Sequence, residues 1–264
     1  MNKVIRAEFG RTINAGLIIA IAGIIFSICF DSFNDLIAGL RNGQGYVGYF
    51  FSNAAIGGMC THYMLPVFTA LPFSVSLCQE RNNKAVSYIV SREGKNRYIF
   101  AKFIVSAISG GFVAVCGTVL LFLMLAMRFP IAGDEFEGAV VSDYFHEWSA
   151  VYYPQLYILT LSILAFCRGV IWSSLALCVS LYTSDFMVVL LSPFLGSYVL
   201  VRIFQIIRVP DMVRPDMILI GQVVIKSSGL TLIIAIAISL TIVTLIGAFF
   251  VGKMKEGLKS GTIY

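Results

Sequence analysis

Residues 16–26 read Gly-Leu-Ile-Ile-Ala-Ile-Ala-Gly-Ile-Ile-Phe, a continuously apolar run. A strand of a membrane β-barrel alternates apolar and polar residues, and this run does not. A membrane helix needs about 20 apolar residues and satisfies its backbone hydrogen bonds internally. The run therefore predicts a transmembrane helix over about residues 13–33. That stretch is too long for a removable signal peptide and lacks a small-residue cleavage pattern, so we expect it to remain as a span.

The rest of the chain has the same character. Hydrophobic residues make up 58% of its 264 residues and charged residues only 12%, whereas soluble domains carry about 25% charged residues. The fold class we predict is an all-α polytopic membrane protein, with residues 1–264 forming a single transmembrane domain. Six stretches are long and apolar enough to cross the bilayer: about 13–33, 60–78, 99–127, 156–182, 185–207 and 230–252.

Basic residues indicate how these spans are oriented, because Lys and Arg favour the cytoplasmic side of short loops. They gather near the N-terminus, between the second and third spans, and in the C-terminal tail, whereas residues 128–155 carry five acidic residues and one arginine. With six spans, the three basic regions lie on one side, so we expect both termini to be cytoplasmic. This bias also accounts for the net charge of +5, and we expect no nucleic-acid partner.

The segment from Glu80 to Arg97 holds five of the 19 Lys and Arg residues. Asn82 or Asn83 is suited to start a helix, and Gly94 to end one. The spacing of Val86, Ile89 and Val90 places these three side chains on one ridge, with Tyr88 and Arg92 together on a neighbouring face. Such a helix can dock in a groove of another protein or lie on lipid headgroups, and the residues alone leave both interpretations open.

The layout around this segment resembles an ABC-2-type (type V fold) transporter permease. The resemblance rests on Glu80 directly after the second span, the ridge of Val86, Ile89 and Val90, then Arg97, and Lys102 early in the third span. One departure is the sequence Gly-Lys-Asn-Arg at 94–97, where many relatives place a proline before the basic residue. This departure leaves the edge of the docking surface open.

The resemblance implies a cytoplasmic coupling helix between the second and third spans, which docks on a separate ABC ATP-binding subunit. It also implies two ATP-binding subunits, a second permease protomer that is identical or homologous, and a multi-pass location in the cytoplasmic membrane of a bacterium. The substrate class it suggests is an amphipathic molecule such as an antimicrobial peptide. The ATPase-coupling residues it implies are Glu80, Val86, Tyr88, Ile89, Val90, Arg92, Gly94, Arg97 and Lys102.

The sequence lacks the common motifs of catalytic and nucleotide-binding sites. It has no GxxxxGK[ST] phosphate loop, no HExxH pair and no GxSxG elbow, and its six cysteines form no CxxC pair. We therefore expect a transport subunit rather than an enzyme, without a metal or cofactor of its own, and ATP and Mg on the partner ATPase. The alternative is an ATP-independent membrane channel, or a structural subunit of another membrane complex.

Arg168 is the charged residue that lies farthest from the ends of a predicted span. It lies 12 residues beyond Leu156, a helical rise of about 18 Å, and so near the middle of the membrane. Trp172 follows one turn later and is placed to cover the guanidinium by a cation–π contact. One hypothesis is that Arg168 and Trp172 line a substrate path, and the other is a structural arginine paired with carbonyls or an acidic residue. Between the fifth and sixth spans, residues 217–225 are too short to cross and predict an external or dipping helix.

Overall fold

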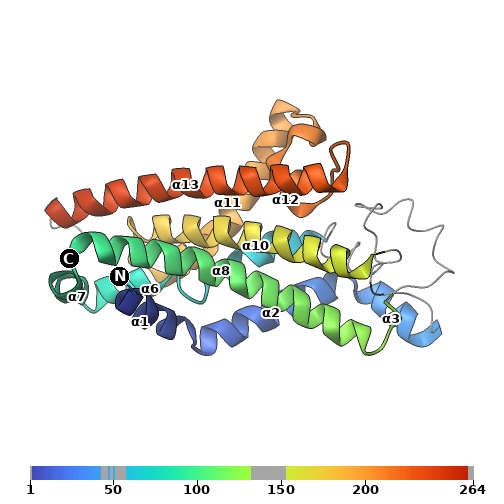
Figure 1. Cartoon of the computed structure of the whole chain (residues 1–264), viewed down its shortest axis with the longest axis horizontal. Helices are drawn as coiled ribbons and strands as arrows, with labels where there is room; N and C mark the ends of the chain where they lie inside the picture. The colour runs from blue at the N-terminus through green and yellow to red at the C-terminus, as the bar shows by residue number, and fades with distance from the viewer. Residues whose placement is uncertain (1, 43–46, 48–49, 51–57, 132–152, 261–264) are drawn as a thin grey trace.

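The computed structural model describes residues 2–42, 47, 50, 58–131 and 153–260, and throughout these ranges its regular elements are helices (Figure 1). In chain order they are α1 (Asn2–Thr12), α2 (Ala15–Asp31), α3 (Phe33–Asn42), α5 (Met59–Ala70), α6 (Ser76–Asn82), α7 (Val86–Glu93), α8 (Lys95–Ala126), α10 (Pro154–Val179), α11 (Phe186–Ile207), the 3-10 turn η4 (Asp211–Val213), α12 (Pro215–Ile220) and α13 (Ser228–Ser260).

Four helices in the described ranges are long and apolar enough to cross a membrane: α8, α10, α11 and α13. They coincide with four of the predicted spans. Helix α2 coincides with the first predicted span but has 17 residues, and it reaches the length of a span only together with α1, from which it is bent by 57°. The protein is therefore all-helical, with four or five candidate membrane spans.

The second predicted span, 60–78, is not one continuous helix. Helix α5 ends at Ala70 and α6 begins at Ser76, with five residues in turns between them. Pro72 has no backbone N–H, and the carbonyl of Phe68 instead accepts from the N–H of Leu71 at 3.3 Å. The single continuous span predicted over 60–78 is therefore interrupted in the structure.

Side chains from other helices bind the interrupted backbone. The hydroxyl of Ser74 donates to the carbonyl of Ser173 at 2.9 Å and lies 3.1 Å from the hydroxyl of Ser106. The side-chain amide of Asn14 donates to the carbonyl of Pro72 at 3.4 Å. Because unpaired polar groups are costly in an apolar interior, these contacts stabilise the break at this position.

Helix α10 lies at the centre of the bundle and contacts α5, α8, α11, α12 and α13. Its closest neighbour is α8, and two glycines make that approach feasible. A Cβ added at Gly169 would meet the carbonyl oxygen of Gly110 and lie 2.9 Å from the Cα of Gly111. Glycine is therefore required where these two backbones cross.

One end of the bundle collects the segments that carry most of the basic residues. Helix α1, helix α7 and the last turns of α13 lie together there, whereas α3 lies at the opposite end (Figure 1). Helices α8 and α13 have 32 and 33 residues, or about 50 Å each, and so are longer than the roughly 30 Å of a hydrocarbon core. Part of each helix would therefore extend beyond a core of that thickness. The acidic stretch that we expect on the other side falls mainly in residues 132–152, outside the described residues.

The segment after α11 folds back into the protein. Arg208 and Gly221 have left-handed backbone conformations, with φ of 56° and 89°, and they end α11 and α12. Ile218, Leu219 and Ile220 are buried, and α12 contacts α10 and α13. This short helix is thus part of the protein interior, rather than a helix lying freely on the membrane surface.

Candidate functional site

Helix α7 is held against the rest of the chain by the ridge predicted for docking. Val86 and Val90 are buried in a cluster with Leu77 of α6, Tyr98 of α8 and Phe250 of α13, and Ile89 packs against its edge. Periodicity identified the ridge, but the structure turns it inward. The start predicted at Asn82 or Asn83 is wrong, because Asn83 ends α6 and α7 begins at Val86.

The opposite face of α7 is open. Tyr88 is 69% exposed, and Ser87, Ser91 and Arg92 are also exposed. Arg92 binds its neighbour Glu93 at 2.9 Å, a surface ion pair of little energetic weight. Gly94 follows with φ of 87°, which turns the chain sharply from α7 into α8, and Lys95 and Arg97 are exposed at the start of α8. Tyr88, Ser91 and Arg92 of α7, with Lys95 and Arg97 just after it, are thus exposed, and we call these five residues the α7 face.

Two other predicted coupling residues lie inside the protein instead. Lys102 is fully buried and Glu80 nearly so. The Nζ of Lys102 donates to Oε1 of Glu80 at 2.8 Å and to Oε2 of Glu8 at 3.1 Å. The hydroxyl of Tyr98 donates to Oε2 of Glu80 at 2.5 Å, and Arg11 also binds Glu80. We call Glu8, Arg11, Glu80, Tyr98 and Lys102 the ionic cluster.

The ionic cluster joins three helices close to α7. Glu8 and Arg11 come from α1, Glu80 from α6, and Lys102 from α8. Its two carboxylates and two cations balance, so the charges are buried without a net excess. The sequence reasoning missed Glu8. The available signal was that Glu8 is the first and only acidic residue before Asp31, in a segment that is otherwise basic and apolar.

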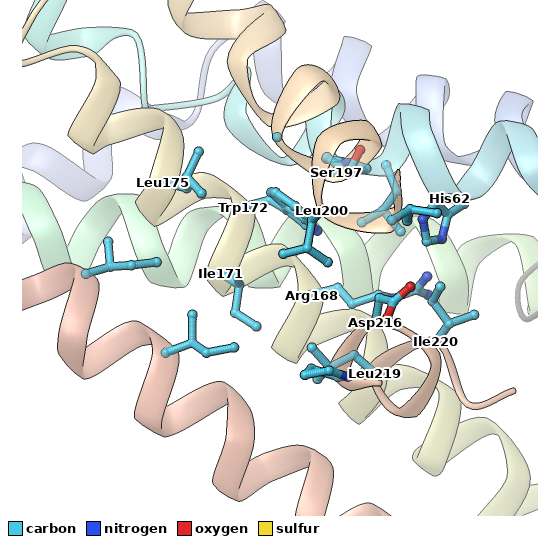
Figure 2. A pocket seen from close by; sticks show the side chains of 17 residues that line it. His62, Arg168, Ile171, Trp172, Leu175, Ser197, Leu200, Asp216, Leu219 and Ile220 are labelled. Carbon is cyan, nitrogen blue, oxygen red and sulfur yellow. The ribbon is translucent and has the colours of Figure 1, made fainter. Parts of the chain in front are cut away.

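A second candidate site is a cavity of about 160 Å³ between α5, α10, α11, α12 and α13 (Figure 2). Its wall is largely apolar. Four polar side chains interrupt that wall: His62, Arg168, Ser197 and Asp216. A second cavity shares His62, Val201, Asp216 and Ile220 with it and continues past Arg214 and Gln222. The two cavities therefore adjoin around α12.

Arg168 reaches this cavity from α10, and Figure 2 shows its side chain extending toward Asp216 and His62. It is only 8% exposed, and its Nε is buried without a hydrogen-bond partner. Within the described residues its guanidinium has no hydrogen bond or ion pair. The structural pairing considered from the sequence is thus not found there.

Asp216 does not neutralise Arg168, because it already has a partner. Arg214 donates to Oδ2 of Asp216 at 2.7 Å and to Oδ1 at 3.3 Å, and it also pairs with Asp211 at 3.2 Å. The hydrogen bond to Asp216 is the largest cause of a raised pKa of the Arg214 guanidinium, and the charge of Asp211 adds to it. Burial opposes this rise. Arg168 is left as the unpaired charge on the cavity wall.

Trp172 lies one turn after Arg168 and lines the same cavity (Figure 2). Among the described residues, Lys102, Arg202 and Arg214 make cation–π contacts. The predicted contact between Arg168 and Trp172 is not one of them. The indole therefore contributes apolar wall rather than a partner for the guanidinium.

No group of three His, Cys, Asp or Glu side chains within the described residues is arranged to hold a metal ion. Comparison with known proteins found no matching family model, no matching curated protein and no matching solved structure.

Proposed function

We propose that this chain is the membrane-spanning permease subunit of an ATP-driven ABC exporter. In this proposal, the α7 face binds an ATP-binding subunit, and a second permease protomer completes the complex. The observation that carries it is that α7 has an exposed side and a buried side. A helix that transmits force needs a free side to bind its partner and a packed side to move the rest of the protein. The substrate class suggested by the resemblance is an amphipathic molecule such as an antimicrobial peptide.

The ionic cluster supports this role for α7. A force applied to α7 would be transmitted to α8 directly through Gly94. It would be transmitted to α6 through the buried cluster that contains Val86 and Val90. Lys102 and Glu80 then tie α6 and α8 to α1. Movement of the ATPase subunits against α7 would therefore displace several membrane helices together, which is what alternating access requires.

The proposal also fixes orientation and span number. The end of the bundle with α1, α7 and the basic end of α13 faces the cytoplasm, and α12 lies toward the outer side. Helix α1 with α2 forms the first crossing, and α5 with α6, interrupted at residues 71–75, forms the second. Six crossings and two cytoplasmic ends follow, in the cytoplasmic membrane of a bacterium.

Co-purification tests the proposal directly. Tagged protein, expressed with its neighbouring gene products and extracted in mild detergent, should retain an ATP-binding subunit. Tyr88→Ala should weaken that association by about tenfold, as the loss of an aromatic hot spot costs about 1.4 kcal/mol or more.

Met212→Ala is the matched control, because Met212 in η4 is as exposed as Tyr88 but lies on the other side of the membrane in this proposal. Recovery of the chain without any ATPase would favour the ATP-independent channel or structural subunit. An equal loss of association in both variants would contradict the assignment of α7 as the docking helix.

A further inference from the structure

The cavity beside Arg168 combines two features that rarely occur together. Its wall is largely apolar, yet the guanidinium of Arg168, a residue that is 8% exposed, enters it with no partner among the described residues. An unpaired charge in an apolar interior is costly, and proteins retain such charges mainly where they act on a ligand, an ion or a proton. The arrangement therefore calls for an anionic ligand group.

The charges around the cavity agree with a negative ligand. Helix α10 contributes Arg168, and the α12 segment contributes Arg214 and Asp216, which pair with each other. Helix α5 contributes His62, whose imidazole can donate a hydrogen bond. Helices α11 and α13 contribute no charged side chain to this cavity. The sum at the cavity is one positive charge.

The remaining wall suits a hydrocarbon chain. Trp172 and Leu175 of α10, Leu200 of α11, and Ile242 and Ile246 of α13 line it. Figure 2 shows Leu175 on the side of the cavity away from Asp216 of α12. A ligand that satisfies both parts carries one anionic group at Arg168 and an apolar chain along these residues. Arg is well suited to the anionic end, since its planar guanidinium can bind a carboxylate or phosphate through two hydrogen bonds.

We propose that this cavity binds an amphiphile with a single anionic headgroup, a carboxylate or a phosphate, through Arg168, with its hydrocarbon chain between α10, α11 and α13. This inference deepens the proposed function, and it rests on that function for the statement that the bound amphiphile is the exported substrate. Binding itself needs no ATPase.

Fluorescence of Trp172 provides a test on the purified full-length chain. The sequence has two tryptophans, Trp148 and Trp172, so Trp148→Phe leaves one reporter, on the cavity wall. The probe is dodecyl phosphate brominated on a carbon in the first half of its chain, because Trp172 lies one helical turn from Arg168 and bromine quenches an indole that it contacts. It should quench Trp172 at least about tenfold more tightly than the equally brominated dodecyl trimethylammonium, which carries the opposite charge.

Variants assign the headgroup contact. Arg168→Gln in the same background should lower the affinity for the phosphate probe by about tenfold or more. Arg168→Lys keeps the charge and should lower that affinity less. Arg202→Gln is the matched control, because Arg202 on α11 is exposed and does not line the cavity. Its affinity for the probe should be unchanged.

Three outcomes would overturn the proposal. The first is equal quenching by the anionic and cationic probes, which involves only the unaltered cavity and so holds even if Arg168→Gln fails to fold. The second is unchanged affinity in a folded Arg168→Gln protein. The third is displacement of the probe by inorganic phosphate at similar concentration, which would make this a site for a free anion. Failure here leaves the α7 co-purification result untouched, so the two proposals are tested separately.

Discussion

The ammonium of Lys102 and the carboxylate of Glu80 lie 2.8 Å apart, and Lys102 is fully buried. The same ammonium lies 3.1 Å from both Glu8 and the hydroxyl of Ser76, and 4.7 Å from the centre of the Phe73 ring. A buried lysine with three oxygen partners and an aromatic neighbour is fully satisfied. Lys102 is therefore the residue on which the ionic cluster depends.

Lys102→Met should destabilise the protein strongly. It removes the buried cation and leaves Arg11 as the only cation of the cluster beside Glu8 and Glu80, and breaking a buried ion pair typically costs about 3–5 kcal/mol. Thermal unfolding in detergent micelles measures the loss. Lys255→Met is the control, since Lys255 on α13 is exposed. Equal stability of the two variants would contradict the structural role of the cluster, whereas partial recovery on adding Glu8→Gln would support it.

Gly169→Ala should also be destabilising, although alanine is the better helix former. The new methyl group has no room beside the backbone of Gly110 and Gly111, so α8 and α10 must separate, at a cost of about 1–3 kcal/mol. Gly252→Ala offers a comparison in which nothing lies within 4 Å of the added carbon, and it should instead gain up to about 1 kcal/mol. A midpoint shift of the same sign in both proteins would show that the crossing is looser than the structure has it.

Gly94→Ala should disturb the position of α7 without creating a clash. A Cβ at Gly94 meets nothing within 4 Å, but its φ of 87° costs an L-residue about 1–2 kcal/mol. We expect reduced co-purification with the ATPase subunit together with a lower thermal midpoint. Gly10→Ala in α1 is equally free of contacts and lacks the positive φ, so it should leave co-purification unchanged and should not lower the thermal midpoint.

Labelling of introduced cysteines tests which side of the membrane each end of the helix bundle occupies. In a background whose six native cysteines are replaced, Met212→Cys in η4 should react with an impermeant maleimide added to intact cells. Ser91→Cys on the α7 face should react only after the membrane is opened. The reverse pattern would invert the proposed orientation, and labelling of both in intact cells would contradict it altogether.

The four long apolar helices were predictable because long apolar runs depend on local composition alone. The start of α8 at Lys95 also follows from Gly94, which the sequence marked as a stop. What the sequence left undetermined depends on distant partners. Helical periodicity identified the ridge of Val86 and Val90 but not what it packs against, and nothing local links Glu8 to Lys102, 94 residues later.

Arg168 shows the same limit in a different form. Its position inside a span follows from counting residues, and its burial follows from the cost of exposing a charge to lipid. Whether a carboxylate reaches it depends on how α12 folds back, and there the pairing of Asp216 with Arg214 decides the matter. No local pattern around Arg168 contains that information.

The interruption between α5 and α6 has a mechanical consequence. Helix α6 belongs to the ionic cluster, and α5 carries His62, Leu65 and Pro66 to the cavity wall. A continuous helix would transmit twist and thrust between them as a rigid rod. Five residues in turns interrupt that rod, and the hydroxyl of Ser74 holds them to the carbonyl of Ser173. In the proposed exporter, the angle at this break, rather than the stiffness of a rod, would determine how far a push at the basic end opens the cavity.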